Sequence, residues 1–159
     1  MSHSTIWKVY KTTATPYKEL SNSWGTVPPL WGWLGMKYLG WEKESVWLHN
    51  SDNPLLWELY KNESVPIHMR FGLMATFDEG IVEIKDLVKA SKLARQVYDA
   101  FGYDPHKANN WNGISKAYIG LSTIKDKRIQ GIALGCTSVS DPWEDRKHQE
   151  PFSIFDYLD

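Results

Sequence analysis

Cysteine is nearly absent from this chain of 159 residues, which contains one, Cys136. A single cysteine excludes an internal disulfide and a multi-cysteine metal site, and it is typical of proteins in a reducing compartment. The sequence also lacks an apolar run of the roughly 18 residues that a membrane-spanning helix needs. Its first residues show no basic region followed by an apolar stretch, as a secretory signal would. We therefore expect a soluble, cytoplasmic protein with no membrane partner.

An excess of charge of one sign is missing as well. The chain has 18 Lys and Arg against 19 Asp and Glu, a formal net charge of -1. This balance argues against a polyanion that mimics DNA and against a strongly basic nucleic-acid binder. The charges are unevenly distributed, however, with a basic stretch at 85–128 and an acidic stretch at 141–159. Either the two stretches neutralise each other within the fold, or a basic binding face is screened by an acidic tail.

The common catalytic motifs are missing too. No P-loop, dinucleotide-binding glycine motif or nucleophile-elbow motif occurs, which disfavours P-loop hydrolysis, Rossmann cofactors and α/β-hydrolase chemistry. The five histidines are not spaced as metal-ligand pairs. Cys136 could be a nucleophile paired with a histidine, but it falls on the apolar side of a predicted strand, which favours inert packing of the thiol. We expect no metal and no cofactor.

Tryptophan is the residue in surplus. There are nine, and the seven that precede residue 60 are Trp7, Trp24, Trp31, Trp33, Trp41, Trp47 and Trp57. Most of them lie at helical spacing and are expected in the core, but a small domain rarely buries nine indoles completely. Trp41, Trp47 and Trp143 fall in predicted loops or short strands. We expect these three to be exposed and available to a partner protein or to the flat ring of a ligand.

Hydrophobic periodicity predicts the order of the elements. Strands are predicted at 6–12, 67–77, 81–84 and 128–139, with a short one at 44–49, and helices at 15–24, 28–39, from 54 onward, at 86–101 and at 109–121. This order predicts a single α+β domain over 1–159 with a small, mainly antiparallel sheet of about three to five strands covered by helices. Its N-terminal half would be a Trp-rich helical layer, and 144–159 could form a semi-ordered acidic tail.

The clearest β signal is the alternation at 67–77, which the turn 78–80 would join to 81–84 as a hairpin. His68, Arg70 and Thr76 would then project from one face of the sheet. Arginine supplies a planar donor fork for phosphate or carboxylate, and histidine an acid or base near neutral pH. The face is therefore either a ligand site or an ordinary solvated surface.

A second candidate site follows the last predicted strand. That strand has a side of small residues at 131, 133 and 135, which permits close approach of a helix or a ligand. Thr137, Ser138 and Asp141 come next and carry oxygens that bind phosphate or sugar, and Trp143 could cover a flat ring. The alternative is an ordinary turn whose tryptophan anchors the tail.

A third candidate is the basic face of the helix at 86–101, with the residue before it. Its cations could follow a phosphate backbone, but no aromatic residue is interleaved among them, and a solvated amphipathic helix has the same pattern. Nucleic acid is therefore not the favoured partner. The face consists of Lys85, Lys89, Lys92 and Arg95.

Two hypotheses for function follow. The first is a non-enzymatic binding protein, an inhibitor or accessory factor, that occludes a partner protein or binds a small aromatic or nucleotide-like ligand through an aromatic-rich surface. The ligand-binding residues would be Trp41, Trp47, Arg70, Thr137, Ser138 and Trp143. The alternative is a metal-independent enzyme acting on a phosphate-containing or nucleotide substrate. In it His68 would be the acid or base, Arg70 the anion clamp, and Ser138 or Asp141 a supporting group.

Overall fold

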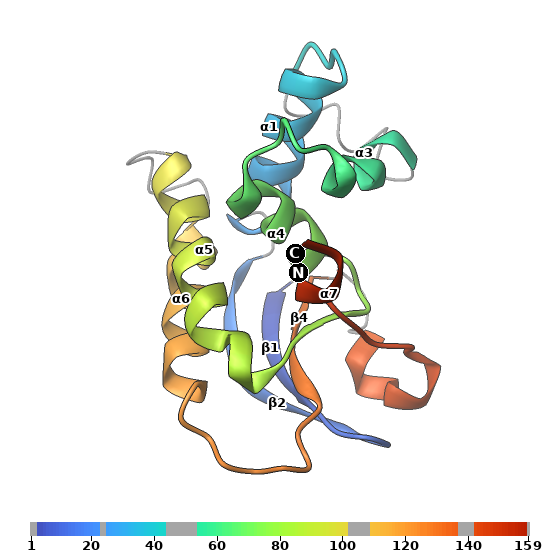
Figure 1. Cartoon of the computed structure of the whole chain (residues 1–159), viewed down its shortest axis with the longest axis vertical. Coiled ribbons are helices and arrows are strands. Elements are labelled where there is room, and N and C mark those ends of the chain that lie inside the picture. The colour runs from blue at the N-terminus through green and yellow to red at the C-terminus, as the bar shows by residue number, and fades with distance from the viewer. Residues whose placement is uncertain (1–2, 23–24, 44–53, 102–108, 137–141, 159) are drawn as a thin grey trace.

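One open β-sheet organises the molecule in this computed structural model (Figure 1). The structure describes residues 3–22, 25–43, 54–101, 109–136 and 142–158. Within them the sheet has the strands β1 (His3–Val9), β2 (Ala14–Asn22), β3 (Gly80–Val82), β4 (Gly131–Gly135) and β5 (Phe152–Ser153). Their order is β2-β1-β4-β3-β5, and neighbours are antiparallel except β3 and β5, which are parallel. The expected α+β domain with a mainly antiparallel sheet is confirmed.

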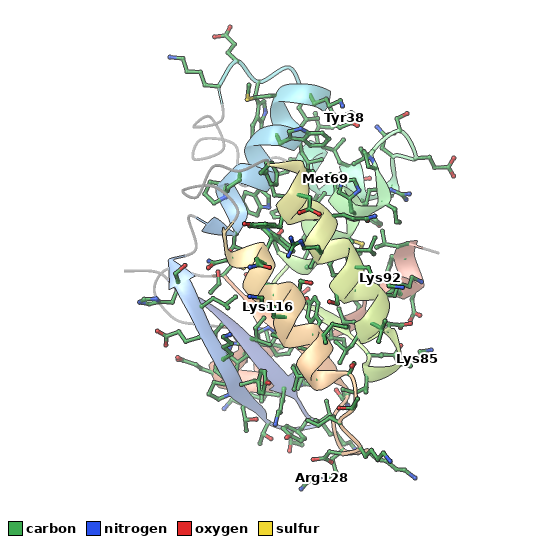
Figure 2. The ribbon with its side chains drawn as sticks, turned by 90° about the vertical axis from the view of Figure 1, so that its left-hand side faces the viewer. Tyr38, Met69, Lys85, Lys92, Lys116 and Arg128 are labelled. Atoms are coloured by element: carbon green, nitrogen blue, oxygen red, sulfur yellow. The ribbon has the colours of Figure 1, made fainter. Side chains whose placement is uncertain are left out.

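Helices cover one face of this sheet. They are α1 (Val27–Tyr38), α3 (Pro54–Glu58), α4 (Ile67–Ala75), α5 (Leu87–Ala100), α6 (Asn109–Leu121) and α7 (Phe155–Leu158), with the short 3₁₀ helices η3 (Leu59–Lys61) and η4 (Ile84–Asp86). A further 3₁₀ helix, η5 (Pro142–His148), lies on the opposite face. α5 and α6 run side by side, and α4 packs on α5 (Figures 1 and 2). The buried strand residues of the main core are Ile6, Val82, Ile132 and Leu134. No helix in the described part of the chain is long and apolar enough to span a membrane.

A single indole covers the other face of the sheet. Trp143 of η5 packs in a second, smaller core with Trp7, Val9, Ile81 and Ala133, and it is fully buried. The small residues of β4 at 131, 133 and 135 permit close approach, as predicted. The group that packs against this side is Trp143 of the same chain. The acidic C-terminal stretch forms η5, β5 and α7 and contributes to both cores.

Several predicted elements are confirmed. The predicted helices at 28–39, 86–101 and 109–121 are α1, α5 and α6, and the predicted strands at 6–12 and 128–139 are β1 and β4. The glycine stop after α1 is also confirmed, because Gly40 has a φ of 73°, which favours glycine. Trp41 then donates its backbone N–H to the Gly35 carbonyl, 3.0 Å away.

The helix predicted at 15–24 is wrong, because the described part of this segment belongs to the edge strand β2. Thr15 followed by Pro16 is a local signal for a helix start, but Pro16 lies opposite Trp7 on an edge strand, where a missing N–H is tolerated. A register shift near this pair disturbs the period-2 pattern that would have revealed the strand. Residues 3–22 are therefore two strands joined by a turn, and the N-terminal half is not helical throughout. The short strand predicted at 44–49 lies outside the described residues.

The strand predicted at 67–77 is also wrong, because the segment forms α4. Its alternation predicts one apolar face, but six of the nine residues of the helix are buried, including Gly72 and Met74 from the predicted polar face. Gly72 lies against Leu30 of α1 and Val97 of α5, so neighbours on several sides remove the polar stripe that marks a surface helix. The hairpin predicted over 67–84, a segment that the structure describes throughout, is absent as a result. β3 pairs instead with β4, in an antiparallel manner.

Candidate binding surface

Five partly exposed aromatic rings meet on one side of the molecule. They come from α3, η3, the turn after α4, β5 and α7, and we call them the aromatic face: Trp57, Tyr60, Phe77, Phe152 and Tyr157. Four of the rings form a closed circuit of edge-to-face contacts, with centroid distances between 5.2 and 6.4 Å. Trp57 joins the circuit through Phe77, at 4.5 Å and 81°. Each such contact adds about 0.5–1.5 kcal/mol beyond the area it buries.

The aromatic face is anchored to the core through Trp31 of α1. The ring of Trp31 meets that of Trp57 edge to face, with centroids 4.8 Å apart. Its indole N–H donates a hydrogen bond to Thr76 Oγ1, 3.0 Å away, and both residues are buried. The Thr76 hydroxyl in turn donates to the Leu73 carbonyl at 2.6 Å, which fixes its direction. The exposed rings therefore rest on a hydrogen-bonded support.

The sheet edge brings the C-terminal rings to this place. Phe152 of β5 donates its backbone N–H to the Glu79 carbonyl, and Ile154 donates to the Ile81 carbonyl. The backbone at Gly80 lies close to α4 and to the residue after β5. A Cβ at Gly80 would lie 2.7 Å from the Met74 carbonyl oxygen and 3.2 Å from the Ile154 side chain. A side chain there would separate α4 from β5. The glycine thus keeps Phe77 and Phe152 within ring contact.

The border of the aromatic face is acidic. Tyr157 is 53% exposed, so part of this aromatic surface faces solvent. Five exposed carboxylates lie within two residues of these rings along the chain, and we call them the acidic border: Glu58, Asp78, Glu79, Glu150 and Asp156. A charged rim around an aromatic centre is the usual anatomy of a protein-binding surface.

One cation of the chain itself is bound at this border. Lys61 Nζ lies over the Tyr60 ring, 5.4 Å from its centroid, and 2.8 Å from Glu58 Oε2. The hydrogen bond to Glu58 raises the pKa of Lys61. The aromatic face therefore combines a ring and a carboxylate in the geometry that holds an ammonium or guanidinium group.

His68 and Arg70, expected together on a strand, do not share a face. Two positions apart on α4, they point about 200° from each other around the helix axis. The Arg70 guanidinium donates from Nε to the Val65 carbonyl at 3.0 Å, and burial lowers the pKa of His68. Thr76, the third member of the predicted face, is buried beneath Trp31. The structure supplies no joint acid–base and anion site from these residues.

The predicted site around Trp143 is not supported by the position of its tryptophan. The expectation that Trp143 is exposed is wrong, and a fully buried indole cannot cover a ligand ring. Trp41 is partly exposed and packs against the core, over Gly35. The remaining residues of this prediction lie outside the described part of the chain: Trp47, Thr137, Ser138 and Asp141.

The predicted basic helix face exists, but three of its four cations contact other groups of the chain. Lys85 lies 3.9 Å from Glu83, and Lys89 Nζ stands 4.3 Å above the Phe155 ring. The Arg95 guanidinium contacts Asp99 and Asn112 and lies over Tyr98. Lys92 is exposed (Figure 2). This is the pattern of an amphipathic surface helix.

Sequence reasoning missed the aromatic face because its rings are far apart along the chain. One signal was present: 152–157 carries three aromatic residues within an acidic segment, a composition that a solvated tail does not need.

Comparisons of the chain with protein-family models, curated proteins and solved structures gave no match.

Proposed function

We propose that this chain is a non-enzymatic binding protein that docks a partner protein on its aromatic face and occludes the segment it covers. The observation that carries the proposal is the closed circuit of partly exposed rings, whose neighbours along the chain include the five carboxylates of the acidic border. Aromatic residues at the centre of a surface supply most of the energy in protein interfaces. The single cysteine supports a cytoplasmic setting.

The chemistry of the border selects the kind of partner. Acidic side chains around the rings attract cations, and a cation over a ring contributes about 0.5–2 kcal/mol, more as water is excluded. Lys61, held between Tyr60 and Glu58, shows the arrangement within the chain itself. The contacted segment of the partner is therefore rich in arginine or lysine. Arginine is favoured, since its planar group both stacks on rings and bonds carboxylates in pairs.

A titration with peptides tests this proposal. Three fluorescein-labelled peptides of equal length, alternating glycine with arginine, lysine or glutamate, are titrated with the full chain and followed by fluorescence anisotropy. We expect the arginine peptide to bind more tightly than the lysine peptide and the glutamate peptide not to bind. Equal affinity for all three would overturn the proposal.

A second measurement separates the aromatic contribution from simple charge attraction. Raising the salt concentration screens exposed charges but leaves ring contacts in place. We expect the difference between the arginine and lysine peptides to persist at about 0.5 M salt, where the Debye length is below about 10 Å. Loss of all binding at that salt concentration would show that the peptides bind by nonspecific charge attraction alone, and it would contradict a role for the rings.

A further inference from the structure

A second charged surface lies at the end of the molecule where the β1–β2 turn meets the α6–β4 loop. We call it the basic end: Lys8, Lys11, Lys125, Lys127 and Arg128. Arg128 marks it at the lower end of Figure 2, beyond the last turn of α6. Its cations come from segments more than 110 residues apart, so only the fold brings them together.

Hydrogen bonds between its segments make the basic end a built surface. Gln130 donates its backbone N–H to the Val9 carbonyl at 2.7 Å, joining the loop to β1. Arg146 of η5 donates from Nε to the Tyr10 carbonyl and from Nη2 to Gln130 Oε1. Three separate parts of the chain are thereby held in one arrangement.

Two tyrosines lie among these cations. The Arg128 guanidinium is 5.8 Å from the centroid of the Tyr10 ring, and Lys8 Nζ is 5.5 Å from that of Tyr17. Tyr17 is 43% exposed and Tyr10 is partly exposed. The basic end therefore places two aromatic rings, each exposed at least in part, among its cations.

An acid lies beside these cations, and it positions one of them. Asp126 accepts hydrogen bonds from the Arg128 backbone N–H and from its guanidinium, at 2.8–3.0 Å. These bonds lower the pKa of Asp126 to about 2, so the pair stays ionised at neutral pH. The five cations of the basic end outweigh this carboxylate. The surface presents net positive charge to a ligand.

We propose that the basic end binds single-stranded nucleic acid, with its lysines and Arg128 on phosphates and Tyr17 stacked on a base. Nonspecific single-strand binding combines a cationic surface with aromatic rings, since every base has a face on which a ring can stack. A duplex keeps its bases stacked on each other, so the tyrosines would contribute nothing to binding it. The basic end and the aromatic face use different residues, so this site does not depend on the proposed function.

Anisotropy titrations with a fluorescein-labelled oligothymidylate of about 15 nucleotides test the site. We expect binding by the full chain at about 50 mM salt that weakens steeply toward 500 mM, because bound counterions are released. In the double variant Lys125→Gln, Lys127→Gln the salt slope should fall by about 1.4, or about 0.7 for each phosphate that is no longer neutralised. Tyr17→Ser should weaken binding several-fold without changing the slope.

A matched control removes two lysines elsewhere. The double variant Lys89→Gln, Lys92→Gln on α5 changes the net charge equally and should bind as the wild type does. The proposal is overturned if the wild type does not bind at 50 mM salt, or if both double variants lose affinity equally. It is also overturned if a duplex of the same length binds as tightly and Tyr17→Ser binds like the wild type, since this would show phosphate attraction without stacking.

Discussion

Trp31 donates its indole N–H to the Thr76 hydroxyl, 3.0 Å away, and this bond joins α1 to the end of α4 directly beneath the aromatic face. Both residues are buried, and Trp31 supports Trp57 by an edge-to-face contact. Through Trp57, this bond connects the packing of the core to the position of the rings in the aromatic face.

Thr76→Val is expected to lower the free energy of unfolding by about 1–3 kcal/mol, because it leaves a buried N–H without its acceptor. Valine has nearly the shape of threonine, so the missing bond and not a cavity causes the change. Urea unfolding followed by tryptophan fluorescence measures it. Thr76→Ser keeps the hydroxyl and should be less destabilised. Equal destabilisation of the two variants would show that the methyl group matters and the bond does not.

Trp143→Ala is expected to lower the free energy of unfolding by about 3–5 kcal/mol, as removal of a fully buried aromatic side chain does. The matched control is Tyr157→Ala, which removes an exposed ring and should change stability much less. Thermal and urea unfolding of both variants give the comparison. A decrease below about 1 kcal/mol for Trp143→Ala would contradict its burial against Trp7 and Ala133.

The two errors of sequence interpretation at 15–24 and 67–77 have one physical cause. Local patterns report local preference, and both segments are decided by distant partners. Pro16 lies in an edge strand because its segment pairs with β1. Gly72 lies in a buried helix because α4 packs against Leu30 of α1 and Val97 of α5. By contrast, α5 has a clear apolar stripe and a solvated face, and its bounds could be predicted from the sequence.

Gly35→Ala is expected to destabilise the chain even though alanine is the better helix former. A Cβ at this position would overlap the Trp41 ring, which rests on the glycine. The strain should exceed the gain of about 1 kcal/mol in helix propensity. Gly120→Ala on α6 is the matched control, since its Cβ would lie 3.5 Å from Tyr17 Oη, an ordinary contact. Urea unfolding should show opposite signs, and stabilisation of both variants would contradict the position of Trp41.

The stability of the chain should fall as the pH drops below about 6.5, in part through His68. Burial lowers the pKa of His68 from 6.5, so the unfolded chain takes up the proton more readily than the folded chain. This term is absent well above pH 6.5 and grows as the pH falls through the two pKa values. Unfolding measured between about pH 5 and pH 8 should be less pH-dependent in His68→Gln. An unchanged pH profile in that variant would contradict the prediction.

The candidate sites differ in how far the sequence predicts them. The cations at 85–95 are a local pattern, and the helix that carries them was predicted correctly. The aromatic face depends on β5 lying parallel beside β3, a pairing that joins Gly80 to Phe152 and that no local pattern encodes. The basic end likewise requires the β1–β2 turn to meet the loop before β4. Sites assembled by strand pairing therefore become visible only with the topology.

Removal of the internal cation should strengthen peptide binding. Lys61 occupies the position between Tyr60 and Glu58, and a cation of the partner would compete with it for this ring and this carboxylate. Lys61→Ala frees both groups and raises the local negative charge, so the arginine peptide should bind more tightly than it does to the wild type. Lys127→Ala, an equal charge change at the basic end, is the control. Equal tightening by both variants would show a general charge effect.

The most direct test of the central claim is one anisotropy titration of the arginine peptide against Tyr157→Ser and Tyr17→Ser. Each variant removes one exposed tyrosine, from the aromatic face and from the basic end respectively. The claim that the aromatic face binds a basic partner segment predicts about tenfold weaker binding by Tyr157→Ser and unchanged binding by Tyr17→Ser. Wild-type affinity in Tyr157→Ser, or equal weakening in the two variants, would contradict it.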